Sequence, residues 1–190
     1  MLVLAEAGFA EQTINKSRFL AMALPVADER ELAAALRAFA AKHPSAHHLA
    51  YAYRLKVGTA IVPRFSDAGE PSGTAGMPVL KLIEGRDLIN VCVAVIRYYG
   101  GINLGTGGLA RAYGGTAKLA LDQAKTDAFV EMQHYPLSLS YKQMDTMNSA
   151  LQKCKGSIVS KSFGEQVDLV LNLPVHEAAN FINRFKPYGE

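Results

Sequence analysis

The sequence has few cysteines, no long apolar run and little excess charge, and each of these shortages excludes a class of protein. Two cysteines in 190 residues are too few for a disulfide framework. Cys92 and Cys154 lie in an apolar and an amphipathic stretch, which favours buried thiols. The most apolar stretch, residues 88–96, is far shorter than the roughly 18 to 20 residues that span a membrane. With 49% hydrophobic residues and no low-complexity tract, the chain is expected to fold into one or two globular domains.

The charge balance and the first residues bear on the compartment and on partners. The opening residues lack a basic segment and reach Glu6 early, so no signal peptide is expected and the sequence predicts a cytoplasmic protein. The net charge is only +3. Residues 1–125 hold 14 Lys and Arg against 10 Asp and Glu, a difference of +4, and the remainder holds 6 against 7. This asymmetry permits an anionic partner for the first part of the chain without requiring one.

Residues 1–126 are predicted to form an α/β domain, a sheet covered by two helices. A capping box at Asp28 and Glu31 opens the first helix, and His43 and Pro44 end it. The glycine- and proline-rich residues 66–78 are expected to be a loop, and residues 79–83 could form a short helix or strand. Strands are expected over residues 16–26, 48–57, 59–65 and 88–99, the last of them central and buried on both faces, and the second helix over residues 109–124.

Residues 127–190 are predicted to form a second, ferredoxin-like domain. Their patterns give the order β-α-β-β-α, which is five of the six elements of that fold. The sixth element, a strand, is missing because the chain stops at residues 187–190. The fold class expected for the whole chain is therefore α+β, with two α/β sandwich-type domains.

A glycine-rich loop between a strand and a helix is the main candidate binding site. Eleven of the 16 glycines fall between Gly69 and Gly115. The stretch GGINLGTGG, residues 100–108, places free N–H groups at a helix N-terminus between Arg97 and Arg111, which suits a phosphate. A tight turn without a ligand is the alternative. Arg111 and Lys118, seven residues apart, share one helix face and either contact phosphates or are solvated charges.

Other residues allow competing interpretations. Asp67 and Glu70 could hold Mg²⁺ or act as acid and base, but capping of N–H groups within their own loop is favoured. His43, His47 and His48 are interpreted as surface or strand-edge histidines rather than metal ligands. Of the neighbouring tyrosines that end the apolar strand, Tyr98 and Tyr99, one is expected to pack inward and the other could stack on a base.

Two long motifs resemble the signature of the IMPACT/YigZ family. They are SDAGEPSGTAGMPVL at residues 66–80 and VAVIRYYGGINLGTGGLARAYGG at residues 93–115. KSRFLA and HHLAYAYRL, upstream of them, are similar to two further family segments. The family's motif positions in the first loop are Asp67, Gly69, Glu70, Pro71, Ser72, Gly73, Thr74 and Gly76, with His48 upstream. In the second motif they are Arg97, Tyr98, Gly100, Gly101, Leu104, Gly105, Gly107, Gly108, Arg111, Ala112 and Tyr113.

The resemblance implies a first domain similar to folds of ribosomal proteins and translation factors, and a second domain similar to one in elongation factor G. It also implies a link to translation, since eukaryotic members act in translational control through protein partners. Two departures matter. Ala68 stands where the family usually has a second Asp, and Ala50 stands where a Cys is common. Both departures weaken an enzymatic interpretation more than a binding one.

The favoured hypothesis is a non-catalytic protein that binds RNA or the ribosome and modulates translation, with no cofactor, metal or membrane partner. The glycine loop, Arg97, Arg111 and Lys118 would form its binding surface. One alternative is an enzyme that acts on a small phosphorylated or peptide-like substrate through Asp67 and Glu70. That alternative predicts a pocket joining the two motif loops and a carboxylate with a raised pKa. A protein-interaction module in translational control is the third possibility.

Overall fold

The computed structural model describes residues 1–185, which divide into two compact units. The first unit is Met1–Phe129 and the second begins at Val130. The first unit extends beyond residue 126 because β7 (Lys125–Ala128) pairs with β1 (Leu2–Glu6) in a two-stranded antiparallel ribbon.

A five-stranded antiparallel sheet forms the centre of the first unit, in the order β2-β3-β6-β4-β5. Its strands are β2 (Gly8–Ile14), β3 (Ser17–Pro25), β4 (His48–Val57), β5 (Ala60–Ser66) and β6 (Val91–Tyr98). Seven consecutive residues of β6 are buried, which confirms the prediction of a central strand covered on both faces. β1 and β2, near the N-terminus, were not anticipated from the sequence pattern.

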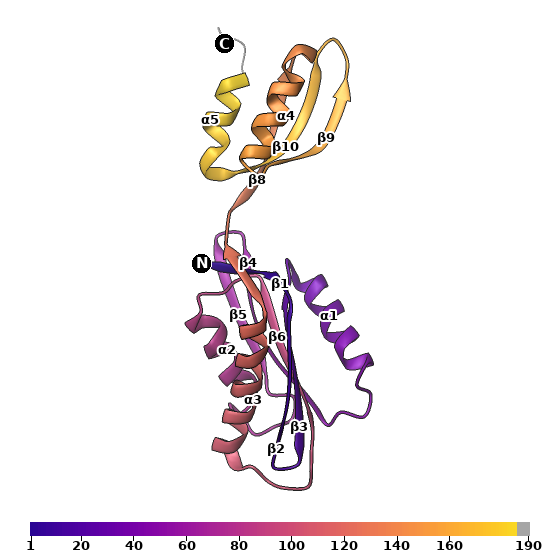
Figure 1. Ribbon diagram of the computed structural model, residues 1–190, viewed down its shortest axis with the longest axis vertical. Coiled ribbons are helices and arrows are strands. Elements are labelled where there is room, and N and C mark those ends of the chain that lie inside the picture. The colour runs from indigo at the N-terminus through magenta and orange to yellow at the C-terminus, as the bar shows by residue number, and fades with distance from the viewer. Residues whose placement is uncertain (186–190) are drawn as a thin grey trace. The chain divides into compact units, whose positions relative to one another are not determined.

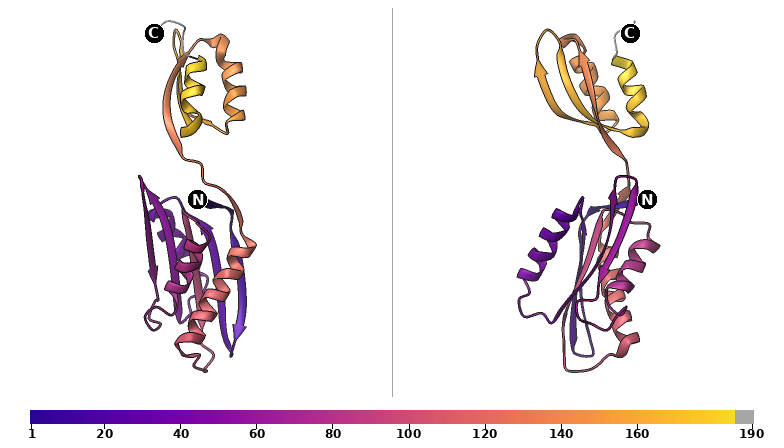
Figure 2. Two further views of the ribbon diagram at one scale, coloured as in Figure 1. Left: turned by 90° about the vertical axis from the view of Figure 1, so that its left-hand side faces the viewer. Right: turned by 180° about the vertical axis from the view of Figure 1, so that it is seen from behind.

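Three helices cover this sheet: α1 (Glu29–Ala41), α2 (Gly76–Gly85) and α3 (Gly105–Gln123). Figures 1 and 2 show α2 and α3 on one face and α1 alone on the other. The predicted cap of α1 is confirmed, because the Asp28 carboxylate accepts the Glu31 N–H at 2.8 Å. The Glu31 carboxylate reaches back to the N–H of Ala27, one residue further than a standard capping box.

The prediction of two helices for this domain was wrong, because α2 is a third. It begins inside the stretch expected to be a loop and continues through residues 79–83, for which a helix was one of two alternatives. Val79, Leu80 and Ile83 are buried at helical spacing on α2. Pro78 lies in the first turn, where the missing N–H of proline would have no helical partner in any case. The glycines and prolines that suggested a loop therefore belong in part to a helix start.

Alternation along β3 gives the two faces of the sheet different neighbours. Phe19, Ala21 and Ala23 belong to the core beneath α2 and α3. Leu20, Met22 and Leu24 point the other way, toward the cluster that includes Phe39 of α1. One face of the sheet is therefore covered by two helices, α2 and α3, and the other by α1 alone.

The second unit has a three-stranded antiparallel sheet in the order β8-β10-β9. Its elements are β8 (Met132–Leu139), η1 (Tyr141–Gln143), α4 (Met144–Lys153), β9 (Ser157–Phe163), β10 (Val167–Pro174) and α5 (Val175–Phe185). The predicted order β-α-β-β-α is confirmed. Both helices pack on one face of the sheet, and Met147 and Leu171 are among the fully buried core residues. The predicted lack of a sixth element concerns residues beyond 185, which lie outside the described residues.

No helix within residues 1–185 is both long and apolar enough to cross a membrane. Thus, for the described part of the chain, the helices agree with the shortness of the apolar runs in the sequence.

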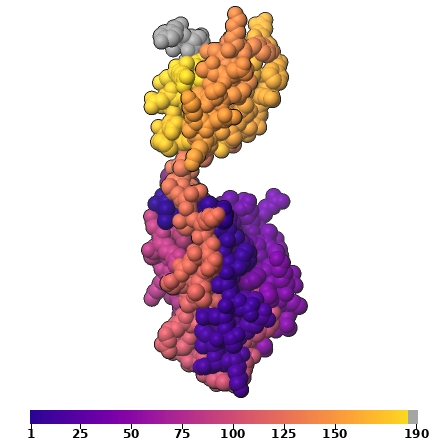
Figure 3. All heavy atoms as spheres, in the orientation of Figure 1, coloured from indigo at the N-terminus to yellow at the C-terminus, as the bar shows by residue number. Residues whose placement is uncertain are grey.

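Gly8 sets how closely the edge strand β2 packs against α3, which lies beside it in the space-filling view (Figure 3). A Cβ at Gly8 would lie 1.9 Å from the carbonyl oxygen of Ala120 in α3. Neither backbone can yield without separating the helix from the sheet, so this close approach requires glycine.

Gly8→Ala is expected to lower the free energy of unfolding by about 2 to 3 kcal/mol, because the added methyl group overpacks the contact between helix and strand. Urea unfolding followed by circular dichroism measures this change. Gly85→Ala is the matched control: a Cβ there meets nothing within 4 Å, so stability should stay constant or rise by up to about 1 kcal/mol. Equal effects of the two substitutions would contradict the close packing of β2 on α3.

Candidate functional site

The two motif loops meet at one end of the sheet in the first unit. The first loop connects β5 to α2, and the second connects β6 to α3. A pocket of about 520 Å³ lies between them, lined by His47, His48, Glu70, Pro71, Arg97, Tyr99, Asn103, Leu104, Gly105, Thr106 and Leu109. The fold therefore brings four predicted site residues into one cavity: His48, Glu70, Arg97 and Gly105.

Asp67 organises the first loop rather than lining the pocket. Its carboxylate accepts the N–H groups of Gly73, Ala75 and Gly76 at 2.8, 3.0 and 2.8 Å. Burial opposes ionisation of Asp67, but these backbone N–H groups prevail and hold its pKa below the ordinary value. The last of them belongs to the first residue of α2, so Asp67 caps that helix. The loop-capping interpretation is confirmed for Asp67 and was wrong for Glu70, whose carboxylate accepts from side chains of β6 and α3 rather than from its own loop.

Glu70 points inward and forms the only buried ion pair among residues 1–185. Its Oε1 accepts from Nη1 of Arg97 at 2.7 Å and from the hydroxyl of Tyr113 at 2.8 Å. The side chains of Glu70 and Arg97 are each only 5% exposed. Burial, followed by the bond to Glu70, strongly raises the pKa of Tyr113 and keeps its hydroxyl protonated as a donor. Glu70 thus joins the first loop to both β6 and α3.

Arg97 is held on several sides. Its Nη2 donates to Oγ of Ser17 at 3.3 Å, and its guanidinium lies 5.5 Å from the ring centre of Phe19 and 5.2 Å from that of Tyr99. Its Nε is buried without a hydrogen-bond partner among residues 1–185. A buried donor left unpaired is costly, so the bonds to Glu70 and Ser17 have to offset this cost in holding Arg97 in place.

His48 lies between the first loop and Glu70. Its Nδ1 is 2.9 Å from the carbonyl oxygen of Ala68, which can only accept, so Nδ1 carries the hydrogen. Its Nε2 lies 3.9 Å from Oε1 of Glu70. In the neutral ring Nε2 is therefore an acceptor at the wall of the pocket, and on protonation it would face the Glu70 carboxylate.

The second loop begins with a close contact and ends at an uncapped helix. A Cβ at Gly100 would lie 2.1 Å from the backbone of Lys16, so the loop can take this path only with glycine. α3 then begins at Gly105, and Leu104, in the N-cap position, provides no side-chain hydrogen bond. The first turn of α3 contains no acidic residue. A Cβ on Gly107 would lie 3.5 Å from Nη1 of Arg111, so the Arg111 guanidinium lies along this first turn.

Several candidate residues lie elsewhere. Tyr98 points to the opposite face, where its hydroxyl is 2.9 Å from Nδ1 of His43. Lys118 is paired with Asp122 at 2.6 Å and is not among the pocket residues. Thr74 donates to the carbonyl oxygen of Pro71 within its own loop. The remaining motif glycines, Gly69, Gly73, Gly76, Gly100, Gly101, Gly107 and Gly108, and Ser72 shape the loops or the start of α3 rather than line the pocket.

The histidines do not converge on one point. His43 bonds to Tyr98, His47 accepts the Tyr99 N–H at 3.1 Å, and His48 bonds to Ala68. Within residues 1–185 no group of three or more His, Cys, Asp or Glu side chains is placed to hold a metal ion.

Sequence reasoning missed the contributions of Ser17 and Thr106. Ser17 is fully buried, and its hydroxyl accepts from Arg97 and from the N–H of Gly100 at 3.2 Å. Its position in the upstream KSRFLA segment was the one available signal. Thr106 lies among motif glycines, and only the pocket shows that it faces a cavity.

Comparison with known proteins finds relatives along most of the chain. The chain is 36% identical over 176 residues to "IMPACT family member YigZ" of Escherichia coli (strain K12), a match covering 90% of this chain and 84% of the relative. It is 38% identical over 161 residues to "IMPACT family member in pol 5′region" of Thermus thermophilus, covering 85% and 86%. A crystal structure described as that of a hypothetical protein is 34% identical, with a TM-score of 0.72 over 96% of this chain and 89% of the other.

The sheet, its helices and the two glycine-rich loops define an α+β protein with a first domain of the Impact type. Residues 15–121 match the model of the Impact N-terminal domain. The chain belongs to the IMPACT family, and the resemblance found in its motifs is confirmed.

Glu70→Gln is expected to lower the free energy of unfolding by about 3 kcal/mol, because it leaves the Arg97 cation buried without a counter-charge. Chemical unfolding at pH 7 measures the loss. Glu11→Gln, which breaks the exposed pair of Glu11 with Arg18, is the matched control and should have a much smaller effect. Equal losses in the free energy of unfolding would contradict a stabilising role of the buried pair beyond that of an exposed one.

Asp67→Asn should destabilise the protein by about 1 to 2 kcal/mol at pH 7, because an amide satisfies the three loop N–H groups less well than a carboxylate. Since the folded pKa of Asp67 is lowered, its contribution is complete above the ordinary pKa of 3.8 and disappears as pH falls through the folded value. Unfolding curves at pH 7 and pH 3 should therefore show a difference from wild type that shrinks in acid. The same substitution at exposed Asp127 is the control, and a difference that persists unchanged at low pH would contradict this role of Asp67.

Proposed function

We propose that the protein is a non-catalytic, cytoplasmic RNA-binding protein that acts in translation, and that a phosphate of the RNA enters the pocket between the two motif loops. The observation that carries this proposal is the start of α3 at the pocket wall. Its backbone N–H groups have no side-chain cap and no acidic neighbour in the first turn. Such a helix start attracts anions through its free donors and the positive end of its dipole.

Two arginines support an anionic ligand. Arg111 lies along the first turn of α3, and no ion-pair partner for it is found among residues 1–185. Arg97 lines the pocket, although its charge is balanced by Glu70. Arg111 itself is not among the residues that line the pocket, but it lies beside the helix start at the pocket wall. A phosphate at the start of α3 would therefore have backbone donors in front of it and an uncompensated cation nearby, which is the composition of a phosphate site.

Family membership supports the link to translation. The resemblance of the motifs implies a first domain similar to those of ribosomal proteins and translation factors, which contact RNA. The excess of +4 in residues 1–125 agrees with a polyanionic partner.

An enzyme acting on a small phosphorylated substrate is the second candidate, and the pocket joining both loops favours it. Its two carboxylates are already engaged, however. Asp67 is used by three N–H groups and has a lowered pKa, the reverse of what an acid catalyst needs. Glu70 is bonded to Arg97 and Tyr113. The binding function therefore fits these contacts better.

The test is the affinity for tRNA and for purified ribosomes at about 50 and 200 mM salt. If about three phosphates are contacted, affinity should fall by roughly 20- to 40-fold between the two conditions. Thr106→Glu places a carboxylate at the start of α3 and should weaken binding by about tenfold or more while favouring the helix. Arg111→Glu should have a similar effect.

Lys118→Glu is the matched control for Arg111→Glu, because both change the charge of the same helix by two units. Lys118 differs in that it lies away from the first turn of α3 and is already paired with Asp122. Its effect should be several-fold smaller. A larger loss with Lys118→Glu than with Thr106→Glu would move the contact to the exposed helix face and contradict the pocket. Affinity that survives high salt would indicate a protein partner. If the protein binds neither tRNA nor ribosomes but hydrolyses a small phosphate ester, the enzyme is favoured.

A further inference from the structure

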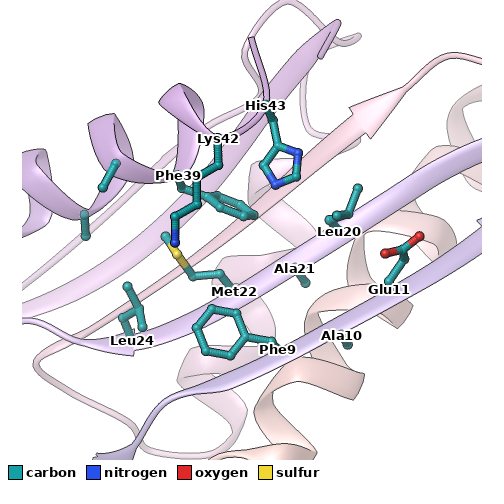
Figure 4. Close-up of a pocket in the computed structure, with 12 residues that line it drawn as sticks. Phe9, Ala10, Glu11, Leu20, Ala21, Met22, Leu24, Phe39, Lys42 and His43 are labelled. Atoms are coloured by element: carbon teal, nitrogen blue, oxygen red, sulfur yellow. The ribbon is translucent and has the colours of Figure 1, made fainter. Parts of the chain in front are cut away.

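A second hollow lies on the other face of the sheet, between α1 and the strands β2 and β3 (Figure 4). Its volume is about 530 Å³, within the range of about 300 to 1,000 Å³ typical of small-molecule sites. The pocket between the two motif loops opens on the face with α2 and α3. The two cavities share no lining residue.

The floor of this groove is apolar and is contributed by both strands. Phe9 of β2 lies beside Met22 of β3, its partner in the strand register, and Leu20 and Leu24 flank Met22 on the same face. The Phe9 side chain is 60% exposed, which is unusual for a large aromatic residue. Burial of this surface by a ligand would be favourable.

The groove exists because the two sheet faces are covered unequally. Two helices pack on one face, whereas α1 alone packs on the other and leaves β2 and part of β3 open (Figure 2). The side of α1 that faces the opening presents small side chains, Ala35 and Ala38, next to Phe39. Because these side chains are small, an elongated ligand has room to lie along the helix.

One uncompensated positive charge lines the groove. Lys42 follows α1 and lines the cavity, and its side chain extends from the helix end toward the strands in Figure 4. No acidic side chain is paired with Lys42 within residues 1–185. Glu11 also lines the groove, but its charge is met by Arg18. His43 is engaged by Tyr98.

We propose that this groove binds an amphipathic carboxylate, a fatty-acid-like molecule whose hydrocarbon chain lies on the floor formed by Phe9, Met22 and Leu24 and whose carboxylate pairs with Lys42. The apolar floor excludes a polyanion such as RNA, which needs several cations, whereas a single charge and a long apolar surface match a ligand with one anionic end. This inference does not depend on the proposed RNA-binding function.

The test is titration calorimetry of the full chain with dodecanoate, decanoate and dodecanol below their aggregation concentrations. Dodecanoate should bind, and the neutral alcohol should bind at least tenfold more weakly because it gains no ion pair. Removing two methylene groups should weaken binding by roughly fourfold to fifteenfold, since a fully buried CH₂ is equivalent to about a fourfold change in affinity.

Variants on exposed positions of α1 leave the fold in place and test the cation. Ala38→Glu puts a carboxylate four residues before Lys42, the favourable spacing for an intrahelical pair, and adds a negative charge to the wall. It should weaken dodecanoate binding by tenfold or more and leave dodecanol binding nearly unchanged. Ala40→Glu, also exposed on α1 but not among the groove residues, is the matched control and should bind as wild type does.

Equal affinity for dodecanol and dodecanoate would overturn the assignment to Lys42, as would binding that Ala38→Glu does not change. Absence of dodecanoate binding would overturn the proposal altogether. Concentration-dependent dimerisation that Ala38→Glu abolishes would instead assign the groove to a second copy of the chain. RNA affinity of the Ala38→Glu variant should equal that of wild type, so failure here and failure of the RNA-binding proposal are separate results.

Discussion

The buried ion pair between Glu70 and Arg97 is the interaction on which the architecture of the candidate site depends. A charge that is 95% removed from water is tolerated only beside its counter-charge, with its remaining bonds satisfied. Glu70 meets this requirement through Arg97 on β6 and Tyr113 on α3. One carboxylate thereby fixes the first motif loop, the end of the central strand and the helix that follows the second loop. The pocket between the loops is the space that this three-way link leaves open.

Two helices start near this site, and they differ in how their first N–H groups are satisfied. The start of α2 is capped by Asp67, a residue of its own preceding loop. The start of α3 has no such cap, and the guanidinium of Arg111 lies along its first turn. A capped helix start has little remaining attraction for an anion, whereas an uncapped one keeps free donors and the full effect of its dipole. This contrast directs the functional interpretation to the second loop rather than to the pair of acidic residues in the first.

Strict alternation along the central strands gives the first unit two faces with different chemistry. Arg97 and Phe19 face α3, while their neighbours Tyr98 and Leu20 face α1. Polar groups and loop donors gather at the end of the first face, and the second face presents an apolar groove with one cation. The two cavities therefore suit different ligands, because a site for phosphate needs several donors and a site for a hydrocarbon needs surface that water does not solvate well.

Local patterns in the sequence determined the central strand, the cap of α1 at Asp28, the element order of the second unit and membership in the IMPACT family. Each depends on residues close together in the chain or on a contiguous motif. The sequence left residues 79–83 of α2 open between a short helix and a strand, and it did not reveal the strands β1 and β2. These elements are short, and partners distant in the chain stabilise them, such as Ala120 beside Gly8. The roles of Asp67 and Glu70, identical in charge and three residues apart, were likewise decided by tertiary structure. A carboxylate becomes a loop cap or a buried counter-ion according to which distant donors the fold brings within hydrogen-bond distance.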